Sequence, residues 1–218
     1  MENLNAPRAV DVPRLRGLYV ITDSQLTPSQ HLIECVALAL RGGAALVQYR
    51  DKSMDAARRA REARELAVLC RAHRVPLIIN DDAALAASAG ADGVHLGRDD
   101  GDIAQARRVL GENAIIGASC YNALESALRA QEQGADYVAF GAFFPSATKP
   151  RAVRADADIL KQAKQKLRIP IAAIGGITPV RGADLIAAGA DMLAVAHGVF
   201  GQSDIMVAAR QYAQLFTR

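Results

Sequence analysis

The stretch that decides the fold is GAALVQ at residues 43–48, whose pattern returns as GADGVHL at 90–96, GADYVAF at 134–140 and GADMLAV at 189–195. In each stretch a glycine–alanine step leads into an apolar run of strand length. Four further strand-like runs lie at residues 18–21, 76–79, 114–116 and 169–174, and helical segments separate all eight. This alternation predicts an α/β protein, a single-domain (β/α)8 TIM barrel with a closed parallel sheet of eight strands.

The segments between the strands carry signals for helix ends. Thr27 and Thr178 each stand before a proline, which predicts an N-cap followed by proline at the first helical position. Asn122, with Glu125 three residues later, has the spacing of a capping box. Alanine-rich segments then run into glycine, which predicts left-handed closing residues at Gly42, Gly90, Gly134 and Gly189. An aspartate stands two residues after each of the last three glycines, at Asp92, Asp136 and Asp191. These aspartates are expected to stabilise the turn and not to act in catalysis.

The bulk composition fits one globular domain. Of 218 residues, 51% are hydrophobic and 22% are charged, and the formal net charge of +3 suits an anionic small substrate. Aromatic residues make up 5% and tryptophan is missing, which argues against a surface that stacks on nucleic-acid bases. A basic segment at 55–73 is expected to present a solvated outer face with Arg58, Arg59, Arg61, Arg64 and Arg71.

The cysteines and the N-terminal segment bear on the compartment. The three cysteines are widely spaced and odd in number, which indicates free thiols under reducing conditions. The first residues include Glu2 and Asp11 and lack the apolar core of a signal peptide. No apolar run approaches the roughly 20 residues of a membrane span. We therefore expect a cytoplasmic protein without nucleic-acid or membrane partners, with a flexible N-terminal arm at residues 1–15 and a catalytic barrel domain at 16–218.

Chemistry in a parallel barrel lies at the carboxyl ends of the strands. Gln48, Arg50 and Lys52 follow the second strand at alternate positions, so they share one side. An amide and two cations there would bind an anion, with arginine as a bidentate fork and lysine as a point charge. A surface patch of salt bridges fits the same residues, and the pattern leaves both interpretations open.

Carboxylates follow the third and fourth strands. Two carboxylates on neighbouring strand ends can share a magnesium ion, which keeps its other positions for water and phosphate. Asp81 and Asp100 are therefore predicted as magnesium ligands. Asp82 and Asp99, which stand beside them, are predicted as helix caps.

The fourth and fifth strands offer further candidates. His95, inside the fourth strand, is expected to be a packed and hydrogen-bonded core residue. Ser119, after the fifth strand, can bond a phosphate or a ring, but it lacks the G-x-S-x-G elbow of an acyl-transfer nucleophile. Cys120 is the alternative nucleophile of this segment.

The last three strand ends suggest phosphate binding. Ser146, Thr148 and Lys149 lie between two prolines in loop 141–150, which predicts a lid over a phosphorylated substrate, with a long loop of incidental polarity as the alternative. Gly176 and the pair Ala196–His197 stand where backbone amides form the usual phosphate site of this barrel. Together with the charged cluster after strands two to four, this indicates two phosphorylated substrates or one diphosphate leaving group.

Several blocks of the sequence occur in an order that resembles one known family. They are Gln48-x-Arg50-x-Lys52, Asn80-Asp81, GVHLG at 93–97 with Asp100, Gly117-x-Ser119, Thr148-Lys149 and AIGGI at 173–177. From about Leu18 to Phe200 the chain resembles the thiamine phosphate synthase family. The resemblance implies a magnesium-dependent transferase that joins an aminopyrimidine methyl diphosphate to a thiazole phosphate and releases pyrophosphate.

The resemblance also implies a role for each matching residue. Gln48, Arg50, Lys52 and Asn80 would hold the pyrimidine diphosphate, and Ser119 and Lys149 would contact the pyrophosphate or the pyrimidine. Asp81 and Asp100 would bind magnesium. The thiazole phosphate would be received by Ser146, Thr148, Gly176, Ala196 and His197. The implied catalytic set is Arg50, Lys52, Ser119 and Lys149.

Three positions depart from the family pattern. Ser146 stands where threonine is common, Arg98 replaces a frequent glutamine, and His197 stands where the family often has serine. The serine keeps the hydroxyl group. The histidine changes the side-chain contact to the thiazole phosphate, while the backbone amides stay available.

Three other functions remain as alternatives. A thiazole tautomerase on the same barrel is the nearest, but it would need neither the carboxylate pair nor Lys149. A phosphosugar isomerase requires an acid and a base that face one substrate, and a non-catalytic barrel would only bind thiamine precursors. The expected partners are phosphorylated small molecules, and both a monomer and a homodimer fit the sequence.

Overall fold

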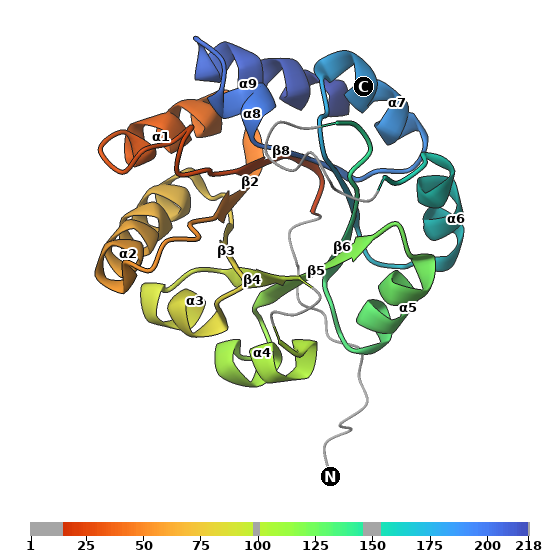
Figure 1. Ribbon diagram of the computed structural model, residues 1–218, viewed down its shortest axis with the longest axis horizontal. Helices are drawn as coiled ribbons and strands as arrows, with labels where there is room; N and C mark the ends of the chain where they lie inside the picture. The colour runs from red at the N-terminus through yellow and green to blue at the C-terminus, as the bar shows by residue number, and fades with distance from the viewer. Residues whose placement is uncertain (1–14, 98–100, 146–153, 218) are drawn as a thin grey trace.

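Eight parallel strands close into a barrel in the order in which they occur along the chain (Figure 1). The computed structural model describes residues 15–97, 101–145 and 154–217. The strands are β1 Gly17–Ile21, β2 Ala44–Tyr49, β3 Leu77–Asn80, β4 Gly93–Leu96, β5 Ile115–Tyr121, β6 Tyr137–Phe140, β7 Ile171–Ile174 and β8 Met192–Val195. The predicted (β/α)8 barrel is therefore confirmed. The expected N-terminal arm stays a prediction, because residues 1–14 lie outside the described ranges.

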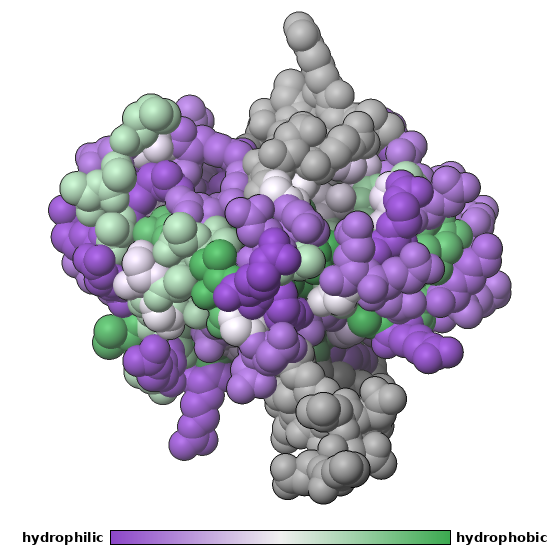
Figure 2. All heavy atoms as spheres, turned by 90° about the horizontal axis from the view of Figure 1, so that it is seen from below, coloured by the Kyte–Doolittle hydropathy of each residue, from purple (hydrophilic) through white to green (hydrophobic). Residues whose placement is uncertain are grey.

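Helices surround the barrel (Figure 1). They are α1 Leu32–Arg41, α2 Ala56–His73, α3 Ala83–Ala89, α4 Ile103–Leu110, α5 Leu124–Glu132, α6 Asp158–Lys166, α7 Pro179–Ala187, α8 His197–Phe200, α9 Ile205–Ala213 and the 3₁₀ helix η1 Gln214–Phe216. The face drawn in Figure 2 is mostly hydrophilic, with smaller apolar areas between the polar side chains. Within the described ranges, none of the helices combines the length and the apolar character that a membrane crossing needs.

Side chains alternate between the inside and the outside of the barrel. On β1, Leu18 and Val20 belong to the large apolar cluster that includes the helices, whereas Tyr19 and Ile21 belong to a separate inner cluster. The other strands follow the same rule, because successive strand residues point to opposite faces. The inner positions are filled by side chains such as Leu46, Ile78, Ile115, Tyr137, Ala172 and Met192. The next inward positions along each strand therefore face the mouth of the barrel.

The repeated Gly-Ala-Asp step joins neighbouring strands. Each aspartate carboxylate accepts a hydrogen bond from a backbone N–H at the start of the preceding strand: Asp92 from Leu77 at 2.8 Å, Asp136 from Ile116 at 2.8 Å and Asp191 from Ile171 at 2.9 Å. The expected structural role is thus confirmed. The mechanism is a bond between two strands, and it fixes where each parallel pair begins.

The helix ends agree only in part with their signals. Thr178 caps α7 by accepting from the Arg181 N–H, and proline follows it as predicted. Thr27 does not cap α1, because its hydroxyl donates to the Asp23 carbonyl oxygen at 2.9 Å and the helix begins later, at Leu32. The capping box at Asn122 and Glu125 was also wrong, since α5 has Ala123 as its N-cap and no side-chain cap bond.

The closing glycines show one shift. Gly90 has the predicted left-handed φ of 68°, and Gly134 and Gly189 have φ of 92° and 121°. Gly42 has a right-handed φ of −77°, and Gly43 takes the positive φ of 100° in its place. A Cβ on Gly42 would lie 2.5 Å from the Ala209 Cβ, so this glycine allows α1 and α9 to pack closely.

Asp191→Ala is expected to lower the free energy of unfolding by about 1–3 kcal/mol, because it leaves the N–H of buried Ile171 without its acceptor. It also removes the partner of Lys164, whose Nζ lies 2.6 Å from Asp191 Oδ1. Urea unfolding followed by circular dichroism measures the change. Asp158→Ala is the control, because it removes only an exposed ion pair with Lys161 and should change stability less. Equal losses in the two variants would contradict the strand-joining role.

Candidate active site

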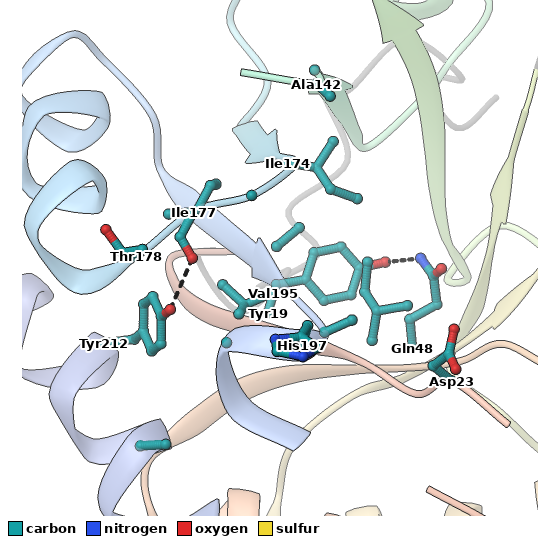
Figure 3. A pocket seen from close by; sticks show the side chains of 18 of the residues that line it. Tyr19, Asp23, Gln48, Ala142, Ile174, Ile177, Thr178, Val195, His197 and Tyr212 are labelled. Atoms are coloured by element: carbon teal, nitrogen blue, oxygen red, sulfur yellow. Dashed lines mark hydrogen bonds between the residues drawn. The ribbon is translucent and has the colours of Figure 1, made fainter. Parts of the chain in front are cut away.

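A cavity of about 760 Å³ opens at the carboxyl ends of the strands, and Figure 3 shows part of its lining. Every strand or the loop after it contributes to the wall. Seven of the predicted site residues line this one cavity: Gln48, Arg50, Asn80, Ser119, Gly176, Ala196 and His197. They come from β2, β3, β5 and the segments after β2, β7 and β8. The barrel thus brings together residues that lie up to 149 positions apart in the sequence.

A second cavity of about 520 Å³ holds the other two described site residues, Lys52 and Asp81. Asn80 lines both cavities, so the two spaces meet at the end of β3. We expected one common space for Gln48, Arg50 and Lys52. Gln48 and Arg50 share the larger cavity, whereas Lys52 lines the second one. Asp100, Ser146, Thr148 and Lys149, as well as Arg98 and Asp99, lie outside the described residues.

Arg50 is held at the mouth of the larger cavity. Its backbone N–H donates to Thr22 Oγ1 at 2.8 Å, and its guanidinium Nη1 lies 3.8 Å from Asp23 Oδ2. The Arg50 side chain keeps 25% of its surface exposed. A half-buried guanidinium in a cavity wall can bind an anionic group with two parallel N–H bonds.

Asp81, the residue directly after β3, has an unusual conformation. Its φ is 66°, a left-handed value that a non-glycine residue adopts only at a cost in free energy. Its backbone N–H donates to the His95 carbonyl oxygen at 2.9 Å, and its carboxylate accepts from Lys52 Nζ. The carboxylate and the ammonium group thus meet on the wall of the second cavity. This pair gives the salt-bridge interpretation of Lys52 direct support.

The carboxylates near Asp81 are engaged in structural bonds. Asp82 caps α3 by accepting from the Leu85 N–H at 2.8 Å, as predicted. Asp82 also accepts from Arg59 at 3.0 Å. Among the residues that the structure describes, no group of three or more histidine, cysteine, aspartate or glutamate side chains is arranged to hold a metal ion. Asp81 is thus the described half of the predicted magnesium pair.

Two arginines of α2 were wrongly expected on a solvated face. Arg58 donates to Asp51 at 2.6 Å and to Ser53 at 2.7 Å, and Arg59 donates to Asp82. These bonds join α2 to the loops that follow β2 and β3. Arg61, Arg64 and Arg71 are exposed, as predicted.

A chain of hydrogen-bonded polar side chains contributes to the wall of the larger cavity. Gln48 Nε2 donates to the Tyr19 hydroxyl (Figure 3), which lies 2.8 Å from the Tyr137 hydroxyl. The Tyr137 hydroxyl lies 2.9 Å from His95 Nδ1, and His95 Nε2 lies 2.9 Å from Ser119 Oγ. His95 is 7% exposed, so the expected packed and hydrogen-bonded histidine is confirmed. The sequence analysis missed both tyrosines.

Burial decides the ionisation of several hydroxyl and thiol groups. It raises the pKa of Tyr19 and of Tyr137 above the ordinary value, so both phenols stay neutral. It also raises the pKa of Cys120 to about 12. Cys120 points away from the barrel interior and is 1% exposed, so it is a core thiol and the alternative of a nucleophile at this position was wrong.

The opposite side of the cavity is built from glycine-rich backbone. Gly175 and Gly176 have positive φ of 105° and 60°, and a Cβ on Gly176 would lie 2.3 Å from the Pro145 carbonyl oxygen. His197 is exposed, begins α8 and lines the same cavity as these glycines. Arg181, which the sequence analysis also missed, lines the same side and has its guanidinium 4.6 Å from the centre of the Phe144 ring.

Comparisons with known proteins agree with this geometry. Residues 18–199 match the model of the family described as thiamine monophosphate synthase. The chain is 54% identical over 202 residues to the thiamine-phosphate synthase of Nitrosococcus oceani, covering 93% of each chain. It is 52% identical over 201 residues to that of Methylococcus capsulatus, covering 92% of this chain and 89% of the relative.

A solved structure shows the same fold. The thiamine phosphate pyrophosphorylase from Pyrococcus furiosus superposes with a TM-score of 0.84 at 34% identity, covering 93% of this chain and 96% of the other. The family match spans every strand of the barrel except the first residue of β1, and therefore both sides of the larger cavity. The chain accordingly belongs to the thiamine monophosphate synthase family, and it is an enzyme of the transferase class.

Proposed function

We propose that the chain is a thiamine phosphate synthase. It would couple 4-amino-2-methyl-5-pyrimidinylmethyl diphosphate to 4-methyl-5-(2-phosphooxyethyl)thiazole and form thiamine monophosphate and pyrophosphate. The observation that carries the proposal is a cavity whose wall combines Gln48, Arg50, Asn80 and Ser119 with glycine-rich backbone, and which meets the space around Lys52 and Asp81 at Asn80. The activity after which the relatives are named supports the same reaction.

The pyrimidine diphosphate would bind where the larger cavity meets the second one at Asn80, and the thiazole phosphate would bind at the glycine-rich backbone. Gln48, Asn80 and Ser119 would take the pyrimidine ring, and Arg50 and Lys52 would take its diphosphate. Gly176, Ala196 and His197 would receive the thiazole phosphate, because glycine backbone allows amide groups to approach a phosphate closely. From the sequence alone, Lys149 is assigned to the pyrophosphate or the pyrimidine. Ser146 and Thr148 are assigned in the same way to the thiazole phosphate.

The reaction follows from the chemistry of the aminopyrimidine. The bond between the methylene carbon and the diphosphate oxygen breaks first, and both electrons leave with the oxygen. The electron-rich ring carries the positive charge until the lone pair of the thiazole nitrogen forms the new carbon–nitrogen bond. Arg50 and Lys52 would stabilise the negative charge on the leaving diphosphate, and no protein nucleophile is required.

The donor set near Asp81 fits magnesium. Asp81 provides a carboxylate, Asn80 and Asp102 line the same cavity, and oxygen atoms are the ligands that this hard cation prefers. Asp81 and Asp100 would hold the ion, with the remaining positions left to water and diphosphate. Bound magnesium would neutralise part of the charge on the departing diphosphate. Lys52, which pairs with Asp81, would then be released to bind the same diphosphate.

A pyrophosphate-release assay tests the function. The purified full-length chain is incubated with magnesium and both substrates, with each substrate alone, and the products are identified by mass spectrometry. Pyrophosphate and thiamine monophosphate in equal amounts, only when both substrates are present, are the expected result. Isomerisation of a thiazole phosphate without pyrophosphate release would support the tautomerase alternative and refute the proposal.

A further inference from the structure

Five polar side chains form a continuous hydrogen-bonded chain across the barrel interior. In spatial order they are Gln48, Tyr19, Tyr137, His95 and Ser119, and they come from five different strands. The first four are between 0% and 7% exposed. Gln48, Tyr19, His95 and Ser119 line the larger cavity, whereas Tyr137 is not part of its wall. A change at Tyr137 can therefore affect Ser119 from outside the cavity wall, through its hydrogen bond to His95.

One assignment gives every donor from Gln48 to His95 a partner within this hydrogen-bonded chain, and it starts from the first bond. Gln48 Nε2 is a donor, so the Tyr19 oxygen accepts and the single Tyr19 proton is directed at Tyr137. The single Tyr137 proton is then directed at His95 Nδ1. A neutral imidazole that accepts at Nδ1 carries its proton on Nε2, which donates to Ser119 Oγ.

The consequence appears at Ser119. Its oxygen accepts from His95, so its own O–H is available to donate to a ligand in the cavity. The reverse direction of the chain would make Ser119 donate to His95 and present only a lone pair to the ligand. The hydrogen-bonding character of the cavity wall thus depends on which nitrogen of His95 carries the proton.

Packing holds the central ring of this chain in place. The Tyr137 ring lies edge-on to Tyr19, with centroids 5.9 Å apart, and is stacked on His95 at 5.5 Å. Gly117 provides the space on its third side, because a Cβ there would lie 2.1 Å from Tyr137 Cζ and 2.4 Å from its hydroxyl oxygen. The glycine that precedes Ser119 by two residues therefore has a packing role in the same chain.

We propose that Tyr137 and His95 are positioning residues that fix Ser119 as a hydrogen-bond donor toward an acceptor nitrogen of a heteroaromatic substrate. This inference rests on the proposed function, in which an aminopyrimidine occupies this side of the cavity. The Tyr137 hydroxyl and both ring nitrogens of His95 are engaged in bonds within the hydrogen-bonded chain. Neither residue therefore has to bind the substrate through these atoms. Their effect passes through the orientation of one hydroxyl group.

The proton position on His95 can be measured without substrate. In the uniformly ¹⁵N-labelled full-length chain at neutral pH, long-range proton–nitrogen correlation spectra distinguish the two neutral tautomers and the imidazolium. The chain contains four histidines, and the His95→Gln variant identifies the signal of His95. We expect a neutral ring with the proton on Nε2. A proton on Nδ1, or on both nitrogens, would overturn the proposed direction of the chain.

A double-mutant cycle then tests whether Tyr137 acts through Ser119. Tyr137→Phe is expected to lower kcat/KM for the pyrimidine diphosphate by about fivefold, the size of one ordinary hydrogen bond, with the KM of the thiazole phosphate unchanged. In the Ser119→Ala background the same change should have almost no further effect, because coupled residues are not additive. Full additivity would show that Tyr137 has only a structural role and would overturn the proposal.

A matched control separates positioning from stability. Tyr49→Phe also deletes a buried phenol, whose hydroxyl donates to Glu62 Oε2 at 2.6 Å on the outer side of β2. It should cost similar stability and leave kcat/KM unchanged. The two proposals can fail separately. If His95 carries its proton on Nε2 but the parent protein releases no pyrophosphate, the proposed function is wrong and the assigned direction of the hydrogen bonds still holds.

Discussion

Asp81→Asn is expected to lower kcat by about a hundredfold or more while the barrel stays folded, because a carboxylate that would hold the charge-neutralising magnesium ion beside the leaving group is lost. Asparagine has nearly the same shape but no charge, so it weakens both the pairing with Lys52 and the binding of a divalent cation. Pyrophosphate release at saturating substrates, measured across a magnesium titration, gives the result. The magnesium concentration for half-maximal rate should rise in the variant, and a chelator should abolish the activity of the parent.

Asp82→Asn is the control for this prediction. Asp82 stands next in the sequence and lines the same cavity, but it caps α3 and pairs with Arg59. Asparagine is an equally good N-cap, so turnover should stay close to the parent value. Parental turnover and magnesium dependence in Asp81→Asn would contradict the role of Asp81. Equal losses in both variants would indicate a general effect of charge at this rim.

The fold was predictable because one local signal is repeated around the whole barrel. Each strand is short and apolar, and an aspartate at three of the strand entries bonds the neighbouring strand. Helix starts were less predictable, because Thr27 has an acceptor closer in the chain than the helix it was expected to cap. Gly42 was misjudged because its reason is contact with Ala209, which no local pattern reveals.

The site was predictable where strand alternation decides it. Gln48 lies two residues after the inward-facing Leu46, and Ser119 lies four after the inward-facing Ile115, so both face the cavity. Tyr19 and Tyr137 were missed because they occupy ordinary inner core positions, and their hydroxyls come from strands 118 residues apart. An inward-facing tyrosine in a barrel strand is a usable signal, because a buried hydroxyl requires a polar partner.

The arginines show a different limit of sequence reasoning. Helical spacing places Arg58 and Arg59 on the surface of α2, but it does not say whether a loop covers that surface. The loops after β2 and β3 reach this part of the helix and supply Asp51 and Asp82 as partners. The helix therefore supports the two loops that carry Lys52 and Asp81.

Arg50→Ala is expected to lower kcat/KM for the pyrimidine diphosphate by about a hundredfold and to leave the KM of the thiazole phosphate nearly unchanged. Arg50 is the described cation of the larger cavity on the side opposite Gly176, and Thr22 fixes its backbone. Arg50→Lys keeps the charge but loses the planar pair of donors, so it should recover only part of the activity. Steady-state kinetics with each substrate varied in turn measures both changes.

Arg64→Ala is the matched control, because Arg64 is exposed on the outer face of α2. Its removal lowers the net charge by the same amount as the removal of Arg50. It should not change either KM. A loss in Arg50→Ala that is shared between the two substrates would mean that Arg50 shapes the whole cavity and does not bind one diphosphate. Full recovery in Arg50→Lys would mean that a point charge is sufficient. Asp23 lies 3.8 Å from the Arg50 guanidinium and helps to orient it. Asp23→Asn should therefore also lower kcat/KM for the pyrimidine diphosphate, by less than Arg50→Ala does.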